Sequence, residues 1–362
     1  MNNHINCSDV SFIIITYNQE RFIESAILSA INQTKSPKEI IVVDDCSTDN
    51  TYEVASRVIS NYKARIKILL HKNAKNLGIV GNFFMGAQLS SGEWITGCAG
   101  DDVAKEDKVD ILIKNLSQHK NSPIYAVGNA VQVINENGIE LTKRYYDLNA
   151  IPQFKSHFIH GSAFAYHRSC FENFPKIDKM IQTEDLILPF RALLLGGILI
   201  TNEISTKYRI SNSNISSNYG GSHKVTIKKM ISLKENNILS YSQRKIDVNS
   251  TTLDDFTKLK LTNLIEKDIA DSYQELNELH KISNFYKKKS CTSLFGLLSI
   301  KVNPNRAKNV KVIIKVLLNS VKIPEYIYIK ALKNRINHRS HFLNTPIESV
   351  SSRVLTLKDY VK

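Results

Sequence analysis

The chain has 362 residues with a hydrophobic fraction of 42%, which suits one large globular domain or two ordinary ones. Its five cysteines are dispersed without a CxxC pair, which argues against a disulfide framework and a structural zinc site and favours a reducing cytosol. The formal charge of +14 lies almost entirely in residues 281–341, which hold fourteen Lys or Arg and one acid. A basic segment on a near-neutral body points to an anionic partner.

Short apolar runs alternate with helical patterns over the first 120 residues. The runs Val10–Ile15 and Ile40–Val43 are rich in β-branched residues, as strands buried on both faces are. Apolar residues from Phe22 to Ile31 recur at helical spacing between them, which predicts a right-handed βαβ unit with parallel strands. The alternation continues with strands at Ile66–Leu70 and Glu93–Thr96 and with helices at Val54–Ile59, Val80–Leu89 and Val109–Leu116. This order predicts a doubly wound α/β domain.

Two of these predicted strands end on paired carboxylates. Asp44 and Asp45 follow the second strand, and Asp101 and Asp102 follow the fourth. Both pairs are expected at the carboxyl edge of the sheet, where open α/β sheets bind ligands. Four converging carboxylates are costly unless a metal ion or hydrogen-bond donors satisfy them. For each pair alone, a solvated cap of the following helix is the alternative.

The predicted elements after residue 120 are mostly strands. They are a hairpin of Tyr125–Ile134 and Ile139–Tyr145, a strand in Phe158–Arg168, an apolar helix at Leu186–Leu195, and closing strands at Ile198–Ile200 and Ile204–Ile210. The helix follows a second acidic motif, Glu184-Asp185, which caps it or faces a substrate.

Four motifs together resemble the family 2 glycosyltransferases with the GT-A fold: SFIIITYNQERFIESAILSAINQT, EIIVVDDCSTDNT, NLGIVGN and GEWITGCAGDD. The similarity extends over roughly residues 9–217. It implies a Rossmann-like, mostly parallel sheet with a nucleotide-sugar site at the carboxyl ends of its strands. It also implies an inverting transferase that uses a nucleotide-diphospho-sugar and a divalent cation, Mn²⁺ or Mg²⁺. The expected domains are a catalytic domain, residues 1–220, and a helical, basic region, residues 221–362.

The resemblance assigns the donor nucleotide to the first two strand ends. Thr16, Tyr17 and Asn18 resemble the base-binding loop. Asp45 is expected to accept from the N3–H of a uracil or thymine base, while Asp44 orients the loop. A carboxylate in this place rejects cytosine, which has no such proton.

A further nucleotide-contact motif is matched by Asn76 and Gly78, where glycine would let the backbone approach the ligand. For Asn76 a plain turn residue is the alternative.

The fourth strand end is expected to hold the cation. Asp102 would bind it as the second acid of a DxD-like motif, and Asp101 would hydrogen-bond the ribose. A hard cation held by carboxylate and phosphate oxygens neutralises the leaving diphosphate. Ala99 stands where many relatives have another Asp, and Ser211 where they often have His, so the metal shell is leaner than usual. Arg209 would contact the diphosphate, or else form a structural salt bridge.

The acceptor side is expected at Glu184 and Asp185, near a segment, Phe158–Arg168, that resembles the acceptor-side strand of the family. The acceptor hydroxyl must lose its proton as it attacks, and the family pattern favours Asp185 as the general base, with Glu184 positioning the acceptor. Helix capping is the alternative for both residues. His160 lies nearby, but a lone His is more often a packing residue, so no role is assigned to it.

The C-terminal third has two helical patterns. Leu261 to Leu279 recur as the apolar face of a long helix with mixed charges. Residues 306–322 form a basic amphipathic pattern that suits either an anionic membrane surface or packing on the catalytic domain or a second subunit.

The function expected from this set is transfer of a sugar, most simply from a UDP-sugar, to a lipid-linked or oligosaccharide acceptor in surface polysaccharide synthesis. The first residues lack the features of a signal peptide and no uncharged apolar run reaches the roughly 18 residues of a membrane span, so we expect a cytoplasmic protein, peripheral on the inner membrane face if the basic region docks there. The alternatives are a nucleotidyltransferase, whose Gly-rich loop is absent from residues 16–21, and a nucleic-acid-binding protein, whose interleaved aromatics are sparse in the basic segment. Sugar, acceptor, linkage and oligomeric state stay open.

Overall fold

The structure is a computed structural model, and it describes residues 6–62, 66–146, 161–210, 227–288, 342–343 and 352–361. The chain forms two compact units. The first comprises Met1–Ser211, Leu239–Ile265 and His341–Lys362, and the second comprises Asn212–Ile238 and Glu266–Ser340. The predicted domain boundary at residue 220 lies outside the described residues, as do Ser211 and the basic pattern at 306–322.

Four parallel strands form the first half of the sheet in the first unit. They are β1 (Val10–Thr16), β2 (Glu39–Asp44), β3 (Lys67–Lys72) and β4 (Trp94–Ala99), in the order β3-β2-β1-β4. The helices between and after them are α1 (Ile23–Ile31), α2 (Thr51–Asn61), α3 (Gly78–Leu89) and α4 (Lys108–Gln118). The predicted βαβ alternation is confirmed.

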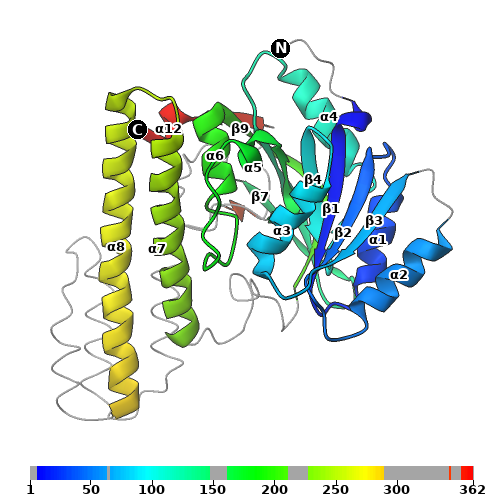
Figure 1. The fold of residues 1–362 in the computed structure, drawn as a ribbon, viewed down its shortest axis with the longest axis horizontal. Coiled ribbons are helices and arrows are strands. Elements are labelled where there is room, and N and C mark those ends of the chain that lie inside the picture. The colour runs from blue at the N-terminus through cyan, green and yellow to red at the C-terminus, as the bar shows by residue number, and fades with distance from the viewer. Residues whose placement is uncertain are drawn as a thin grey trace. The chain divides into compact units, whose positions relative to one another are not determined.

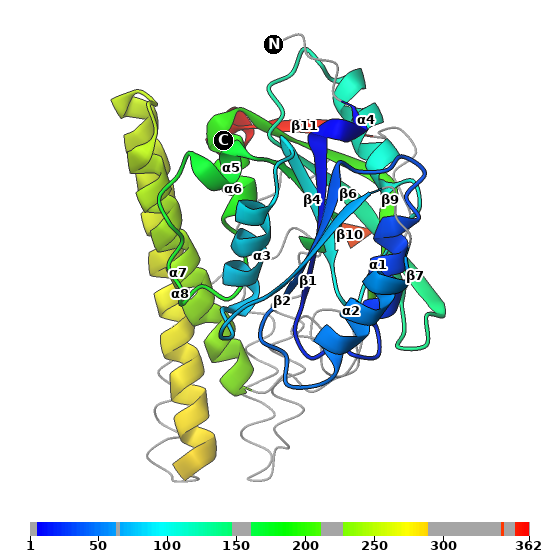
Figure 2. The same ribbon diagram turned by 45° about the vertical axis from the view of Figure 1, so that its right-hand side comes forward.

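Successive residues of β1 pack on opposite faces of the sheet, which explains its unbroken apolar run. Phe12 and Ile14 pack in the cluster that includes residues of α1, α2 and α4, whereas Ile13 packs with Ala87 of α3. Figure 1 shows these elements, and Figure 2 shows α3 on one side of β1 and β2 with α1 and α2 on the other.

The second half of the sheet is mixed. β6 (Ala126–Ile134) pairs antiparallel with β7 (Glu140–Tyr146) and β8 (Phe164–His167), and parallel with β9 (Gly197–Arg209). β9 also pairs with the short β5 (Val103–Ala104) and with β11 (Ser352–Thr356), and β10 (Phe342–Leu343) pairs with β7. The predicted hairpin is therefore confirmed.

The two predicted closing strands are one long strand, β9, and the separation between them was wrong. The polar residues Thr201 and Asn202 suggested a break, but Thr201 is buried and its hydroxyl accepts a hydrogen bond from Asn129 Nδ2 at 2.8 Å. Register shifts in the pairing of β6 with β9, on either side of Ala130, keep the ladder continuous past this point.

The remaining elements are helical. They are the 3₁₀ turns η1 (Cys7–Asp9) and η2 (Gly161–Ala163), and the helices α5 (Ser169–Glu172), α6 (Leu188–Leu195), α7 (Ile227–Ser250), α8 (Asp255–Lys288) and α12 (Leu357–Val361). The predicted long helix over Leu261–Leu279 is confirmed within α8. Among the described residues, none of the helices has the length and apolarity needed to span a bilayer.

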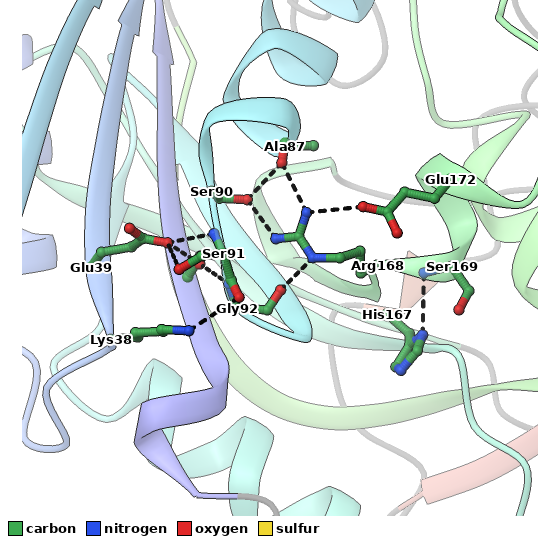
Figure 3. Close-up of polar contacts among 11 residues, drawn as sticks. Lys38, Glu39, Ala87, Ser90, Ser91, Gly92, His167, Arg168, Ser169 and Glu172 are labelled. Carbon is green, nitrogen blue, oxygen red and sulfur yellow. Dashed lines mark hydrogen bonds and ion pairs between the residues drawn. The ribbon is translucent and has the colours of Figure 1, made fainter.

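The amino edge of the sheet is closed by a polar network, shown in Figure 3. Glu39, at the start of β2, is almost fully buried, and its Oε1 accepts from Ser11 Oγ at 2.9 Å and from Ser91 N and Oγ at 2.6 and 2.8 Å. Nearby, Arg168 donates from Nε to Gly92 O at 2.7 Å and from its terminal nitrogens to the end of α3. We refer to Glu39, Ser11, Ser91, Gly92 and Arg168 as the amino-edge network.

Candidate active site

The carboxyl ends of β1, β2 and β4 meet at one edge of the sheet. In the strand register Thr16 lies beside Asp44, and Ile15 lies beside Ala99, so the two acidic pairs follow the strands on either side of β1. This confirms the expectation that the two pairs share an edge. It is also the edge at which open α/β sheets bind ligands.

The loop after β1 is tied to the turn after β2. Asn18 donates its backbone N–H to Ser47 Oγ at 2.9 Å, and its Oδ1 accepts from Thr48 N at 2.9 Å. Asn18 and Cys46 both have left-handed backbone conformations, with φ of 54° and 62°. Thr16 is buried, whereas Tyr17 is 45% exposed. Hydrogen bonds thus fix the backbone of the predicted base-binding loop to the turn after β2, and the Tyr17 side chain is exposed at its surface.

Asp45 holds the turn that precedes α3. Its Oδ1 accepts from Leu77 N at 2.7 Å and from Asn73 Nδ2 at 2.9 Å, and its Oδ2 accepts from Gly78 N at 2.9 Å. The side chain is 2% exposed. Three donors from its own chain therefore engage the carboxylate that the resemblance assigned to the base.

Asn76 and Gly78 shape the same turn. Asn76 Oδ1 accepts from Gly78 N at 3.0 Å, and Gly78 has φ of 76°. A β-carbon built at Gly78 would have no atom within 4 Å. The backbone conformation alone requires a glycine here, and the close approach of a ligand stays a prediction.

Asp44 has an unsatisfied oxygen. Its Oδ2 accepts from Ser47 N at 2.9 Å, but its buried Oδ1 has no hydrogen-bond partner among the described residues. A buried carboxylate oxygen without a donor is unusual and costly, and such groups gather at functional sites.

Asp102 has a similar unsatisfied oxygen. Its Oδ1 accepts from Arg209 N at 2.8 Å, while its buried Oδ2 has no hydrogen-bond partner among the described residues. Burial, and then the charge of Asp101, raises the pKa of Asp102 to about 8, against the opposing effects of Ser162, Arg209 and Lys108. In the part of the chain that the structure describes, no three His, Cys, Asp or Glu form a ready metal-binding group.

Arg209 is an anchor rather than an open cation. Its guanidinium donates to the carbonyls of Asp101, Asn135 and Glu136 at 2.7, 3.0 and 2.9 Å, and it lies 4.7 Å from the centre of the Phe22 ring. The residue is 5% exposed. These bonds join the β6–β7 turn to the Asp101 backbone, and the diphosphate contact of Arg209 stays a prediction.

Glu184 and Asp185 lie against Gly161 of η2. A β-carbon at Gly161 would come within 2.6 Å of Glu184 Oε1 and 3.2 Å of Asp185 Oδ1. Burial, followed by the charge of Asp185, raises the pKa of Glu184 to about 8, and a hydrogen bond to Asp185 contributes in the same direction. The pair therefore holds a shared proton on Glu184 near neutral pH.

Ser162, next to Gly161, connects the two acidic clusters. Its Oγ accepts from Ala99 N at 3.1 Å, at the end of β4, and its hydroxyl lowers the pKa of Asp102. Neighbouring residues of η2 therefore contact both groups: Gly161 lies beside Glu184 and Asp185, and Ser162 interacts with the Asp102 carboxylate.

Lys108 is a member of the site that the sequence analysis missed. Its Nζ donates to Gly97 O and Ser162 O at 2.5 Å each and to Thr206 Oγ1 at 3.0 Å. Burial lowers its pKa to about 8. Through these three hydrogen bonds, one ammonium group joins β4, η2 and β9. Its place beside Val109, Leu112 and Leu116 on the apolar face of α4 was the available signal.

Comparison with known proteins identifies the family. Residues 11–174 match the family described as Glycosyl transferase family 2. A relative in Haemophilus influenzae, described as an uncharacterized glycosyltransferase, is 28% identical over 313 residues, which cover 81% of this chain and 94% of the relative. A cholesterol galactosyltransferase of Borreliella burgdorferi is 33% identical over 115 residues, 32% of this chain and 31% of that protein.

Two solved structures share the fold. TarS of S. aureus (residues 1–349), in complex with UDP-GlcNAc, has a TM-score of 0.52 at 16% identity, covering 80% of this chain and 79% of that one. The mannosyltransferase PcManGT of Pyrobaculum calidifontis, in complex with GDP-Man and Mn²⁺, has a TM-score of 0.53 at 14% identity, covering 91% and 88%. The mixed α/β sheet with helices after it is that of a GT-A glycosyltransferase. Residues 11–174 of this chain are a family 2 glycosyltransferase domain, and the chain is a glycosyltransferase.

Proposed function

We propose that the protein is an inverting glycosyltransferase that moves a sugar from a nucleotide-diphospho-sugar, with a UDP-sugar preferred, to a glycan or lipid-linked glycan in surface polysaccharide synthesis. The observation that carries the proposal is a pair of buried carboxylate oxygens, Asp44 Oδ1 and Asp102 Oδ2, which have no hydrogen-bond partner among the described residues. They follow strands β2 and β4, on either side of β1, at the carboxyl edge of the sheet. Each is an acceptor for a group that a ligand would bring.

Asp44, rather than Asp45, is proposed to recognise the base. Asp45 already receives three hydrogen bonds from the turn at 73–78, whereas Asp44 Oδ1 receives none from the residues that the structure describes. A ring N–H, as in uracil, thymine or guanine, would satisfy this oxygen, and the lone pair of cytosine N3 would be repelled. Tyr17, 45% exposed at the neighbouring strand end, offers a ring for stacking. Among the neighbours, TarS binds UDP-GlcNAc and PcManGT binds GDP-Man.

Asp102 is proposed to hold a divalent cation together with the diphosphate, and Asp101 to hydrogen-bond the ribose. A carboxylate whose buried Oδ2 has no partner among the described residues and whose pKa is raised fits a hard cation that prefers oxygen ligands. When bound, such an ion neutralises charge on the leaving diphosphate. Arg209 would support the site by fixing the Asp101 backbone and the Asp102 carboxylate.

Asp185 is proposed as the general base. The acceptor oxygen would attack the anomeric carbon, the bond from that carbon to the diphosphate oxygen would break, and Asp185 would take the hydroxyl proton. Glu184, which holds the shared proton, would donate a hydrogen bond to Asp185 and orient it. A single displacement of this kind inverts the anomeric centre.

The basic segment at residues 281–341 is proposed to dock on the anionic inner face of the cytoplasmic membrane, where lipid-linked acceptors lie. None of the relatives and structures described above is a nucleotidyltransferase or a nucleic-acid-binding protein, so neither alternative gains support from them.

The test is release of the nucleoside diphosphate from a panel of UDP-, dTDP-, GDP- and CDP-sugars with Mn²⁺ or Mg²⁺. We expect turnover of one donor that requires the metal, is lost in Asp102→Asn, and fails with every CDP-sugar. Asp44→Asn should weaken nucleotide binding, while Asp185→Asn should bind the donor normally and fail in transfer. Binding of no sugar nucleotide, or equal binding of CDP and UDP, would contradict the proposal.

A further inference from the structure

Residues 239–250 of helix α7 present a buried polar face within the first compact unit. Gln243, Arg244 and Asp247 are 3%, 1% and 0% exposed. This stretch lies well outside the family match at residues 11–174. Buried polar side chains need partners, and the partners of these three lie in the segment of residues 170–191, which carries Glu184 and Asp185.

Asp247 binds helix α6 through an ion pair with Arg191. Arg191 donates from Nε to Asp247 Oδ2 at 2.8 Å and from Nη2 to Oδ1 at 3.0 Å, and both side chains are fully buried. Arg191 also donates to the carbonyls of Cys170 and Pro175, at 3.3 and 2.6 Å. A bidentate buried pair fixes orientation, because moving either partner leaves a buried charge without compensation.

Arg244 binds the backbone of Leu186, the residue that follows Asp185. Its Nε–H donates to Leu186 O at 2.6 Å, and its guanidinium lies 5.1 Å from the ring centre of Phe190. One helical position earlier, Gln243 Oε1 accepts from Asp178 N at 3.1 Å. The helix therefore holds the acidic segment from both sides, at residues 178 and 186.

Apolar contacts complete the attachment. Leu239 packs against the cluster of Val80, Ile177, Ile181 and Ile187, one helical turn from Gln243. Leu239, Gln243 and Asp247 are spaced four apart, so one face of α7 makes all these contacts.

We propose that this face of α7 belongs to the catalytic machinery, with Arg244 as the positioning residue that sets the Glu184–Asp185 pair at the acceptor hydroxyl. The inference rests on the proposed role of that pair. A catalytic base must meet its proton within hydrogen-bonding distance, and a displacement of about 1 Å costs on the order of 100-fold in rate.

The test uses the full chain with Arg244→Met and Arg244→Lys. Three quantities are measured: the dissociation constant of UDP, kcat and KM for release of UDP from the donor that the panel selects, and hydrogen exchange at the amides of Ile187 and Leu188, which donate to Glu184 O at 2.8 and 3.0 Å. We expect Arg244→Met to lower kcat about 10- to 100-fold, with UDP affinity and donor KM within about 2-fold, and to speed exchange at both amides. Arg244→Lys should show the same pattern, more weakly.

Arg168→Met is the matched control. Arg168 makes the same kind of bond, from Nε to Gly92 O at 2.7 Å, but at the amino edge shown in Figure 3. We expect this variant to lose stability and to keep kcat. Equal loss of kcat in Arg168→Met and Arg244→Met, or unchanged kcat and exchange in both Arg244 variants, would overturn the proposal.

Asp185→Asn separates this inference from the proposed function. If that variant keeps full transfer, the assigned base is wrong, whereas the exchange rates still decide whether Arg244 holds the segment. If Asp185→Asn abolishes transfer and the Arg244 variants do not reduce it, only the inference about α7 fails. Should Arg244→Met not fold, Arg244→Lys and Gln243→Met provide the same comparison.

Discussion

The two ends of strand β2 carry buried carboxylates in opposite conditions. At the amino end, Glu39 Oε1 receives three hydrogen bonds and Oε2 lies 3.6 Å from Lys67 Nζ. Burial alone would raise the pKa of Glu39, but bonds from Ser91 and Ser11, with Lys67, bring it below the usual value. At the carboxyl end, Asp44 Oδ1 has no hydrogen-bond partner among the described residues. The same holds for Oδ2 of Asp102, which follows β4 on the other side of β1. We infer that the satisfied acid stabilises the fold, and the two acids with an oxygen that lacks a partner are the ones proposed to bind a ligand.

The largest expected effect is that of Asp102→Asn on activity. Asn keeps the volume and can still accept from Arg209 N, but it removes the charge proposed to hold the cation. We expect metal-dependent donor turnover to fall about 100-fold or more, while the free energy of unfolding in a chelator stays equal or increases, because Asn removes a buried carboxyl whose pKa is raised to about 8 and which is costly to ionise in the fold. Kinetics and urea denaturation check both. A clear loss of stability would show that Asp102 is structural, like Glu39.

Glu39→Ala is the converse experiment. It leaves Ser11 Oγ and both donors of Ser91 without their acceptor, so we expect the free energy of unfolding to fall by about 2–4 kcal/mol. The folded enzyme should retain its kcat and KM, since the amino edge is remote from the strand ends that carry the acids. Loss of activity without loss of stability would break the distinction between the two edges.

The pH dependence of stability should differ in sign between the two kinds of acid. The pKa of Glu184 is raised from 4.5 to about 8, so the folded protein keeps a proton that the unfolded chain has released. Its contribution to the free energy of unfolding is fully present below about pH 4.5 and falls as pH rises to 8, by up to about 1.4 kcal/mol per unit.

Denaturation of the wild type, Glu184→Gln and Glu39→Gln between pH 3 and 8.5 isolates this slope and covers the range in which each acid titrates. The variant should lose less stability over the range than the wild type does. Glu39→Gln is the control with the opposite sign, because the pKa of Glu39 is lowered and its contribution is lost only as pH falls. Parallel curves for wild type and Glu184→Gln would show that the acidic pair does not share a proton.

The smallest expected effects are those of two glycine substitutions, one at the acidic pair and one at the turn before α3. Gly161→Ala would place a methyl group 2.6 Å from Glu184 Oε1, so the acids must move, and we expect kcat to fall by about 10-fold. The methyl group of Gly78→Ala would enter open space, and its cost comes only from the positive φ. We therefore expect the free energy of unfolding to fall by about 1 kcal/mol with unchanged kcat. A drop in kcat for Gly78→Ala would indicate close approach of the ligand at that turn.

The sequence predicted the parallel strands and their acidic ends well, because apolar runs and strand–helix order are local patterns. It assigned the base to Asp45, whereas the contacts in the structure favour Asp44 in our proposal. Which carboxylate reaches the turn at residues 73–78 depends on the left-handed backbone at Cys46 and on contacts with a distant segment. The contacts of Arg209 and the place of Lys108 in the site could not be predicted for the same reason, since their partners come from separate elements: two for Arg209 and three for Lys108.

The pairing of β11 with β9 constrains the order of folding during synthesis. Ser352–Thr356 lines the strand beside Gly197–Thr201, and Leu355 is almost fully buried there. A ribosome must therefore translate past residue 356 before the edge of β9 can be covered. Until then a nascent chain carries an exposed strand edge, which is a template for aggregation. Deletion of residues 352–361 should make a chain that needs chaperones to fold.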